Sequence, residues 1–103
     1  MTYGVMVNVT APVEMYDALH REVVRSTHAA VEGLLLHIGR STSDGFQVIE
    51  VWTDKDQFDR YSQEVVWPAA ARLADEQVGA APEMRTEEFE VRGLVLPAAH
   101  LVQ

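Results

Sequence analysis

Two apolar segments decide the fold of this chain: Gly33-Leu-Leu-Leu-His-Ile-Gly-Arg40 and Phe46-Gln-Val-Ile-Glu-Val-Trp52. Both are rich in branched and aromatic residues, which favour strands. The Asp44-Gly45 pair between them is typical of a tight type I′ turn, which needs two residues with positive φ. The segments therefore predict a β-hairpin. Because side chains alternate between the two faces of a strand, this hairpin carries apolar residues on both faces.

The alternation sorts the hairpin side chains into two sets. One set is Leu36, Ile38, Ile49 and Val51, and the other is Leu35, His37, Val48, Glu50 and Trp52. With Asp44 and Gly45 as the central turn residues, Ser43 is predicted to pair with Phe46, Gly39 with Glu50, and His37 with Trp52. A change of pairing by two residues would keep these sets intact.

Residues before the hairpin predict a strand and a helix. Alternation indicates a strand over Tyr3–Thr10. Pro12 fits the first turn of a helix, where its missing N–H does no harm. The apolar stripe of that helix is Met15, Ala18, Leu19 and Val23, and Gly33 ends the pattern.

Residues after the hairpin predict a second helix and a final strand. Thr53-Asp-Lys-Asp56 resembles a capping box, and Pro68 must interrupt or kink the helix that follows. A further helical segment is expected over Ala69–Val78, closed by Gly79. The last strand is expected over Thr86–Leu96, followed by an apolar tail over 97–103.

The predicted order βαββαβ is the ferredoxin-like arrangement, an α+β fold with an antiparallel sheet, in one domain spanning 1–103. Both helices then cover the same face of the sheet. We expect the covered face to carry Val5, Val7, Val9, Leu36, Ile38, Ile49 and Val51, and the open face to carry Met6, Asn8, Leu35, His37, Val48, Glu50 and Trp52. Because an open apolar face is costly in water, we expect a second copy of the chain to cover it as a homodimer.

Composition excludes several classes of protein. The net charge is −8, from 16 acidic and 8 basic side chains, with no basic stripe, which argues against nucleic-acid binding. There is no cysteine, no signal-peptide pattern at the start and no apolar run long enough to span a bilayer. We therefore expect a cytoplasmic protein without a membrane partner.

His37 and Glu50 are the leading catalytic candidates, because both are predicted to lie on the open face. A His–carboxylate pair can act as a base and its orienting group, and a pKa near neutrality suits proton abstraction from a phenol or a β-dicarbonyl. The alternative is a histidine buried at an interface and paired structurally with Glu50. A buried carboxylate needs a partner in either case, and for Glu50 the partner could be His37, Arg40, Arg92 or a residue of a second subunit.

Other side chains could contact a ligand or could serve only to pack the core. Asn8 could hold an oxyanion as a third catalytic residue, or could simply satisfy a backbone group. The predicted contacts to a small hydrophobic or aromatic ligand are Trp52, Tyr61, Leu35, Met6 and Phe58. The four histidines lack metal-ligand spacing, and no phosphate loop or dinucleotide fingerprint is present, so we expect neither metal nor cofactor.

The stretch Val48-Ile-Glu-Val-Trp-Thr-Asp-Lys-Asp-Gln-Phe-Asp-Arg-Tyr61 resembles the dimeric α+β barrel superfamily, in particular the antibiotic biosynthesis monooxygenase-like group. The resemblance spans about residues 3–92. It implies a dimer whose sheets pack face to face, with a cavity in each subunit. Haem-degrading members carry an Asn, a Trp and a His ligand where this chain has Asn8, Tyr61 and Ala71. Loss of the iron ligand argues against haem degradation.

The resemblance implies three possible functions. The first is a cofactor-independent monooxygenase that abstracts a proton from an aromatic or polyketide-like molecule, whose anion then reacts directly with O2. The second is an isomerase or cyclase that works through an enolate in the same cavity. The third is a non-catalytic ligand-binding or structural dimer. One fold serves all three, so the fold does not choose between them.

Overall fold

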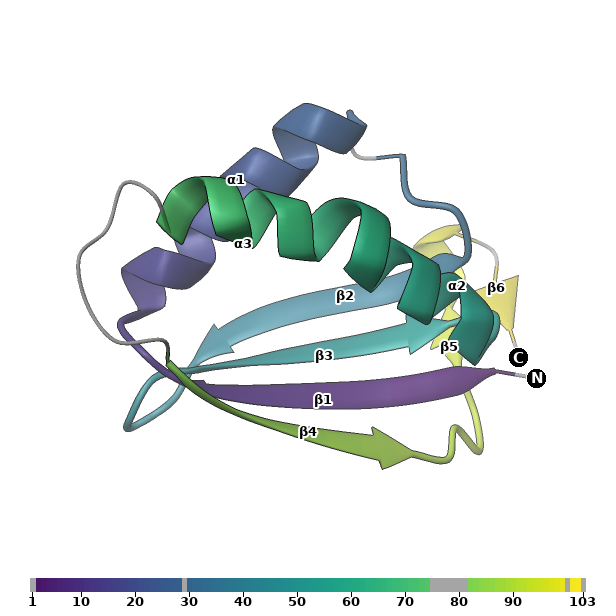
Figure 1. The fold of residues 1–103 in the computed structure, drawn as a ribbon. Coiled ribbons are helices and arrows are strands. Elements are labelled where there is room, and N and C mark those ends of the chain that lie inside the picture. The colour runs from purple at the N-terminus through teal and green to yellow at the C-terminus, as the bar shows by residue number, and fades with distance from the viewer. Residues whose placement is uncertain (1, 29, 75–81, 100, 103) are drawn as a thin grey trace.

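The computed structural model describes residues 2–28, 30–74, 82–99 and 101–102. Four strands form one antiparallel sheet: β1 (Tyr3–Thr10), β2 (Leu34–Ser41), β3 (Phe46–Trp52) and β4 (Glu83–Phe89), in the spatial order β2-β3-β1-β4. Helix α1 (Val13–Thr27), helix α2 (Lys55–Tyr61) and helix α3 (Trp67–Ala74) all lie over the same face of this sheet (Figure 1). The predicted α+β, ferredoxin-like fold is therefore confirmed.

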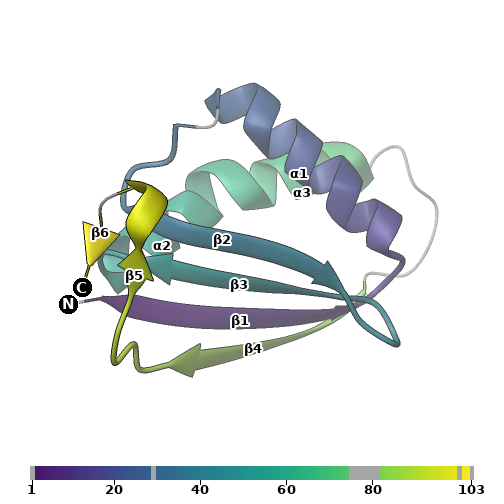
Figure 2. The same cartoon turned by 180° about the vertical axis from the view of Figure 1, so that it is seen from behind.

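The chain beyond β4 differs from the predicted long strand. Strand β4 ends at Phe89, which pairs with Gly4, because β1 begins at Tyr3 and offers little further backbone to pair with. Strand β5 (Val95–Leu96), a 3₁₀ turn (Pro97–Ala99) and strand β6 (Leu101–Val102) then form a small hairpin beside the N-terminus (Figures 1 and 2). The helical segment expected up to Val78 and Gly79 runs into residues 75–81, which lie outside the described residues.

The β2–β3 connection differs from the predicted two-residue turn. It is a four-residue loop, Thr42–Gly45, in which the Thr42 N–H donates to the Gly45 carbonyl oxygen at 2.8 Å. Among the described residues only His28 and Gly33 have positive φ, so the expected type I′ geometry is absent. Gly45 serves another purpose, since a Cβ there would collide with the backbone carbonyl of Val9.

The longer loop changes the pairing of the hairpin but not its two faces. Ser41 pairs with Phe46, and His37 pairs with Glu50 rather than with Trp52. The shift is two residues, so each side chain keeps its predicted face. A β-bulge lies between Leu34 and Leu36, which places Leu35 at an irregular position.

The prediction of which face the helices cover is wrong for the hairpin. In strand β1, Val5 lies opposite Glu50 and Val7 opposite Val48, so these valines share the face of His37. The helix-covered face therefore carries Val5, Val7, Val9, His37, Val48, Glu50 and Trp52. The open face carries Met6, Asn8, Leu36, Ile38, Ile49 and Val51. Trp52 is fully buried on the covered face.

The second helical region is continuous but irregular. Asp54, not Thr53, caps α2, and its side chain accepts a hydrogen bond from the Gln57 N–H at 2.9 Å. A π-helical turn (Ser62–Val66) joins α2 to α3. Pro68, the second residue of α3, cannot donate the regular helical hydrogen bond to the residue four before it. The predicted interruption is thus a widened turn, and the helix continues after it.

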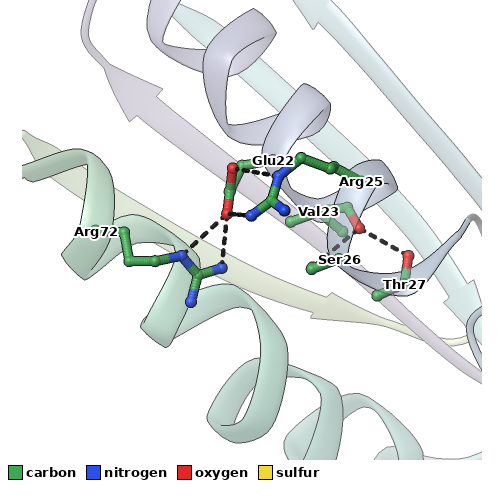
Figure 3. A network of polar contacts seen from close by, with 6 residues as sticks. All are labelled: Glu22, Val23, Arg25, Ser26, Thr27 and Arg72. Atoms are coloured by element: carbon green, nitrogen blue, oxygen red, sulfur yellow. Dashed lines mark hydrogen bonds and ion pairs between the residues drawn. The ribbon is translucent and has the colours of Figure 1, made fainter.

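Ionic contacts join α1 to α3 above the sheet. Glu22 of α1 accepts hydrogen bonds from Arg25 of the same helix and from Arg72 of α3, whose Nε lies 3.0 Å away (Figure 3). The two arginines lower the pKa of Glu22, with the Arg25 hydrogen bond as the largest cause. At the end of α1, Ser26 and Thr27 donate to the Val23 carbonyl. None of the helices in the described ranges is long and apolar enough to cross a membrane.

Gly45→Ala tests the close approach of the loop to β1. The added methyl group meets backbone, which cannot rotate away, so the substitution is expected to cost about 1–3 kcal/mol of folding free energy. The melting temperature should then fall by about 4–8 °C for each kcal/mol. Gly93→Ala is the matched control, because nothing lies within 4 Å of a Cβ at that position. Equal melting temperatures for both variants would contradict the described packing.

Candidate active site

A buried carboxylate–imidazole pair lies at the centre of the helix-covered face. His37 of β2 and Glu50 of β3 stand opposite each other in the sheet. The His37 Nδ1 and Glu50 Oε2 atoms are 2.7 Å apart, and the side chains are 24% and 8% exposed. The sequence prediction that these two residues share a face is confirmed, although that face lies beneath the helices and is not the open one. Their contact selects His37 from the partners that the sequence left open for Glu50.

Trp52 binds the second oxygen of this carboxylate. Its indole Nε1–H donates to Glu50 Oε1 at 3.2 Å. With Glu50 ionised, both of its oxygens are acceptors, and the contact to His37 then requires a proton on Nδ1. In the neutral imidazole the other nitrogen, Nε2, is left as an acceptor. Glu50 thus orients His37 as a base whose free lone pair points away from β3.

Tyr16 of α1 occupies that lone pair. Its hydroxyl oxygen lies 2.7 Å from His37 Nε2, so the phenol O–H donates to the neutral imidazole. Gly39 makes room for the ring, because a Cβ at that position would collide with the Tyr16 phenol group. Burial is the largest cause that raises the pKa of Tyr16, followed by the negative charge of Glu50. Tyr16 is therefore held as a phenol.

His20 extends the cluster to the surface. It follows Tyr16 by one helical turn, and its Nδ1 lies 3.4 Å from the Tyr16 hydroxyl, a longer contact than that to His37. The ring of His20 stacks on His37, with centroids 5.5 Å apart and an interplanar angle of 18°. Since the His20 side chain is exposed, the row Glu50–His37–Tyr16–His20 runs from the interior to solvent.

Aromatic side chains form the wall next to Glu50. The ring centroid of Trp52 lies 5.0 Å from Tyr61 and 5.9 Å from Phe58, in tilted and edge-on arrangements. Burial, and then the charge of Glu50, raise the pKa of Tyr61. Three of the five predicted ligand contacts, Trp52, Tyr61 and Phe58, therefore lie together beside the pair.

The remaining predicted residues lie elsewhere. Asn8 stands on the open face and accepts a hydrogen bond from the Gln47 side chain at 3.0 Å. Met6 lies on that same open face, and Leu35 lies in the bulge of β2. The expectation that Asn8 and Met6 share a face with His37 is wrong, because β1 is offset by one residue from the predicted alignment.

Sequence reasoning missed Tyr16 and His20. Both lie on α1 four residues apart, a spacing that places them on the same face of a helix. Each directly follows a residue of the predicted apolar stripe, Met15 and Leu19, and the stripe alone does not show that they face the sheet. A tyrosine and a histidine at this spacing, facing a strand histidine, were the available signal.

Hollows in the described surface lie away from the pair. One, of about 470 Å³, is lined by residues 10–13 and 41–45. Another, of about 310 Å³, is lined by Thr2, Tyr3 and residues 54–56. Neither is lined by His37 or Glu50. Within the described ranges, no three His, Asp or Glu side chains converge as metal ligands.

Comparison with known proteins shows that solved structures share the fold of this chain. No family model matches the sequence, and no curated protein matches it. Solved structures do match. A variant of SnoaB, described as a cofactor-independent oxygenase from Streptomyces nogalater, aligns at 24% identity over 93% of this chain and 97% of that chain, with a TM-score of 0.63. The chain has the fold of the antibiotic biosynthesis monooxygenase-like proteins.

Two further structures support the same fold. A protein of unknown function from Nitrosomonas europaea aligns at 15% identity over 92% of this chain and 95% of that chain, with a TM-score of 0.61. A candidate antibiotic biosynthesis monooxygenase from Caulobacter crescentus aligns at 16% identity over 87% and 91%, with a TM-score of 0.58. At these identities the likeness establishes the fold, and the chemistry has to be argued from the residues.

Alkaline titration tests the environment of the tyrosines. Burial is the largest cause that raises the pKa of each of the three, Tyr3, Tyr16 and Tyr61, above the ordinary value of 10.0. The folded chain thus holds these protons more tightly than the unfolded chain. The resulting stability is present in full below pH 10.0 and is lost as the pH rises above it. Tyrosinate absorbance should therefore appear together with unfolding. A midpoint near 10.0 in protein that stays folded by circular dichroism would contradict the described burial.

Proposed function

We propose that this chain is a cofactor-independent monooxygenase that acts on an aromatic or polyketide-like small molecule. The observation that carries the proposal is the Glu50–His37 pair, whose carboxylate is buried against the indole of Trp52, with Tyr61 packed on that indole. SnoaB, a protein of similar fold, is described as an oxygenase that needs no cofactor. His37 and Glu50 are the catalytic residues of this proposal.

The proposed chemistry begins with proton abstraction. The substrate loses a proton to the base and keeps the electron pair as a delocalised anion. The imidazolium formed at His37 is stabilised by the Glu50 carboxylate, because opposite charges at this distance favour the charged form. The electron-rich anion then reduces O2 and forms a bond to one of its oxygen atoms. Loss of water leaves a carbonyl, so that one CH2 group and one O2 give one C=O group and one water.

Two other functions fit the same site. An isomerase or cyclase would use the same base and an enolate without O2. A non-catalytic dimer is favoured by one specific observation, namely that Tyr16 packs directly on the acceptor nitrogen of His37. Neither alternative requires a metal or an organic cofactor.

Oxygen uptake separates these functions. Anthrone is a suitable probe, because its CH2 group is acidic and its anion reacts with O2. The wild-type chain should accelerate uptake, and His37→Ala and His37→Gln should each lose about 10²–10⁴-fold, the usual contribution of a general base. His28→Asn is the matched control, since His28 is an exposed histidine at the end of α1 and asparagine tolerates its positive φ.

The outcomes assign the function. Acceleration that survives His37→Gln would refute His37 as the base. Exchange of the anthrone CH2 protons in D2O without added oxygen uptake would favour the isomerase or cyclase. A wild-type chain that promotes neither process would favour the non-catalytic dimer. Melting temperatures of the variants separate loss of chemistry from loss of fold.

We also propose that the open face of the sheet is covered by a second copy of the chain. This face carries the apolar side chains of Met6, Leu36, Ile38 and Ile49, and Ile38 is 44% exposed, whereas Val51 on the same face is already buried within the chain. An apolar sheet face of this kind marks an interface. An obligate dimer would bury more than about 2,000 Å² in total. The cytoplasmic location remains a prediction from composition.

Ile38→Glu tests this arrangement. A charge on the open face should convert the dimer into a species near the 11.5 kDa of one chain, measured by sedimentation at micromolar concentration. Val24→Glu is the matched control, because Val24 is 40% exposed on α1, on the other side of the sheet. Trp52→Glu is unsuitable, since Trp52 is buried within the chain. A wild-type chain that sediments as a monomer would refute the dimer.

A further inference from the structure

Both ring nitrogens of His37 are occupied, and this leaves the proposed base without a free site. Nδ1 donates to Glu50, and Nε2 accepts from Tyr16 at 2.7 Å. A bound molecule therefore cannot reach Nε2 while the phenol group stays in place. The Tyr16 hydroxyl, in contrast, donates one hydrogen bond and has acceptor capacity left. It is the group that is hydrogen-bonded to the acceptor nitrogen of the base.

We propose that Tyr16 is a catalytic residue that relays the proton of a bound phenol, or of a comparably acidic aromatic molecule, to His37. This inference rests on the proposed function and names the group of the site that touches the substrate. The Tyr16 ring is held for this role by tilted packing on Phe46, with centroids 5.7 Å apart, and by the space over Gly39. These contacts come from β2 and β3, so the sheet positions the relay.

The relay moves two protons in one step. The O–H bond of the bound phenol breaks, its electron pair stays on the phenolate, and its proton passes to the Tyr16 oxygen. At the same time the original Tyr16 proton passes to His37 Nε2. Tyr16 ends as a neutral phenol, and the imidazolium is paired with Glu50. A free tyrosinate is avoided, in agreement with the raised pKa that burial and Glu50 impose on Tyr16.

His20 supplies the return path for the proton. Its Nδ1 is 3.4 Å from the Tyr16 hydroxyl, and its exposed ring exchanges protons with water. A small rotation of the Tyr16 or His20 side chain would shorten this contact to an ordinary hydrogen bond. His20 is therefore a positioning and exit group, whereas Tyr16 contacts the reacting atom.

4-Nitrophenol is the probe for this relay, because its phenolate is yellow and its phenol is not. At a pH below its own pKa, the wild-type chain should bind it and increase the yellow, ionised fraction. Tyr16→Phe keeps the ring but removes the hydroxyl. The ionised fraction of the bound probe should fall about tenfold or more, since a hydrogen bond to a charged group is lost. Tyr3→Phe is the matched control, because Tyr3 is a half-buried tyrosine outside the relay.

The possible results separate the relay from the proposed function. Equal ionisation by Tyr16→Phe and wild type would overturn the relay and leave His37 as the base. Failure of the wild-type chain to bind or ionise the probe would overturn both. A slower appearance of bound phenolate in His20→Ala, restored by added imidazole, would support the exit path. No slowing would remove His20 from the relay. His28→Asn should not differ from wild type.

A measurement on the unaltered chain covers the case in which Tyr16→Phe does not fold. Nitrogen-15 NMR distinguishes the two neutral forms of an imidazole. The relay requires the His37 proton on Nδ1, with Nε2 free to accept from Tyr16. A neutral His37 with its proton on Nε2 would overturn the proposal, because that nitrogen could not then receive the Tyr16 proton.

Discussion

The burial of one carboxylate organises the centre of this molecule. Glu50 is 6% exposed, and an isolated charge at such a position would cost several kcal/mol in real proteins, about the whole stability of a small domain. The chain meets this cost with two donors from the same sheet face, the indole of Trp52 and the imidazole of His37. No buried side-chain polar atom in the described part of the molecule lacks a partner. The orientation of His37, and through it the place of Tyr16, follows from this requirement.

The sheet and the helices contribute differently to the site. Strands β2 and β3 bring the imidazole and the carboxylate together by direct cross-strand pairing, and the indole of Trp52 lies two residues further along the same face of β3. Helix α1 adds Tyr16 and His20 from above. The ion pair of Glu22 with Arg72 joins α1 to α3, and Arg25 binds the same carboxylate from within α1 (Figure 3). The sheet therefore fixes the position of His37, whereas the positions of Tyr16 and His20 depend on how α1 packs on the sheet.

The sequence predicted the fold, and it predicted which hairpin side chains share a face. Alternation within Gly33–Arg40 and Phe46–Trp52 is a local property, so a pairing error of two residues left His37 next to Glu50. The position of β1 was harder to predict, because it joins the sheet across a helix and its valines alternate with Met6 and Asn8. Since the hairpin is apolar on both faces, nothing in the pattern showed which set the valines of β1 would join. Asn8 was therefore predicted to share the face of His37, whereas it lies on the opposite face of the sheet.

The π-helical turn has a consequence for the phase of the second helix. Tyr61 and Ala69 are eight residues apart, which is about 2.2 turns of a regular α-helix, so their side chains would diverge by about 80°. A π-helical turn takes up about one residue more than an α-helical turn. Eight residues across Ser62–Val66 then complete about two whole turns. Tyr61 can meet Trp52 while Ala69, which is fully buried, also faces the sheet. Because Pro68 has no N–H, the widened turn loses no hydrogen bond at that residue. The two halves of the helix can therefore turn their apolar side chains toward the same face of the sheet.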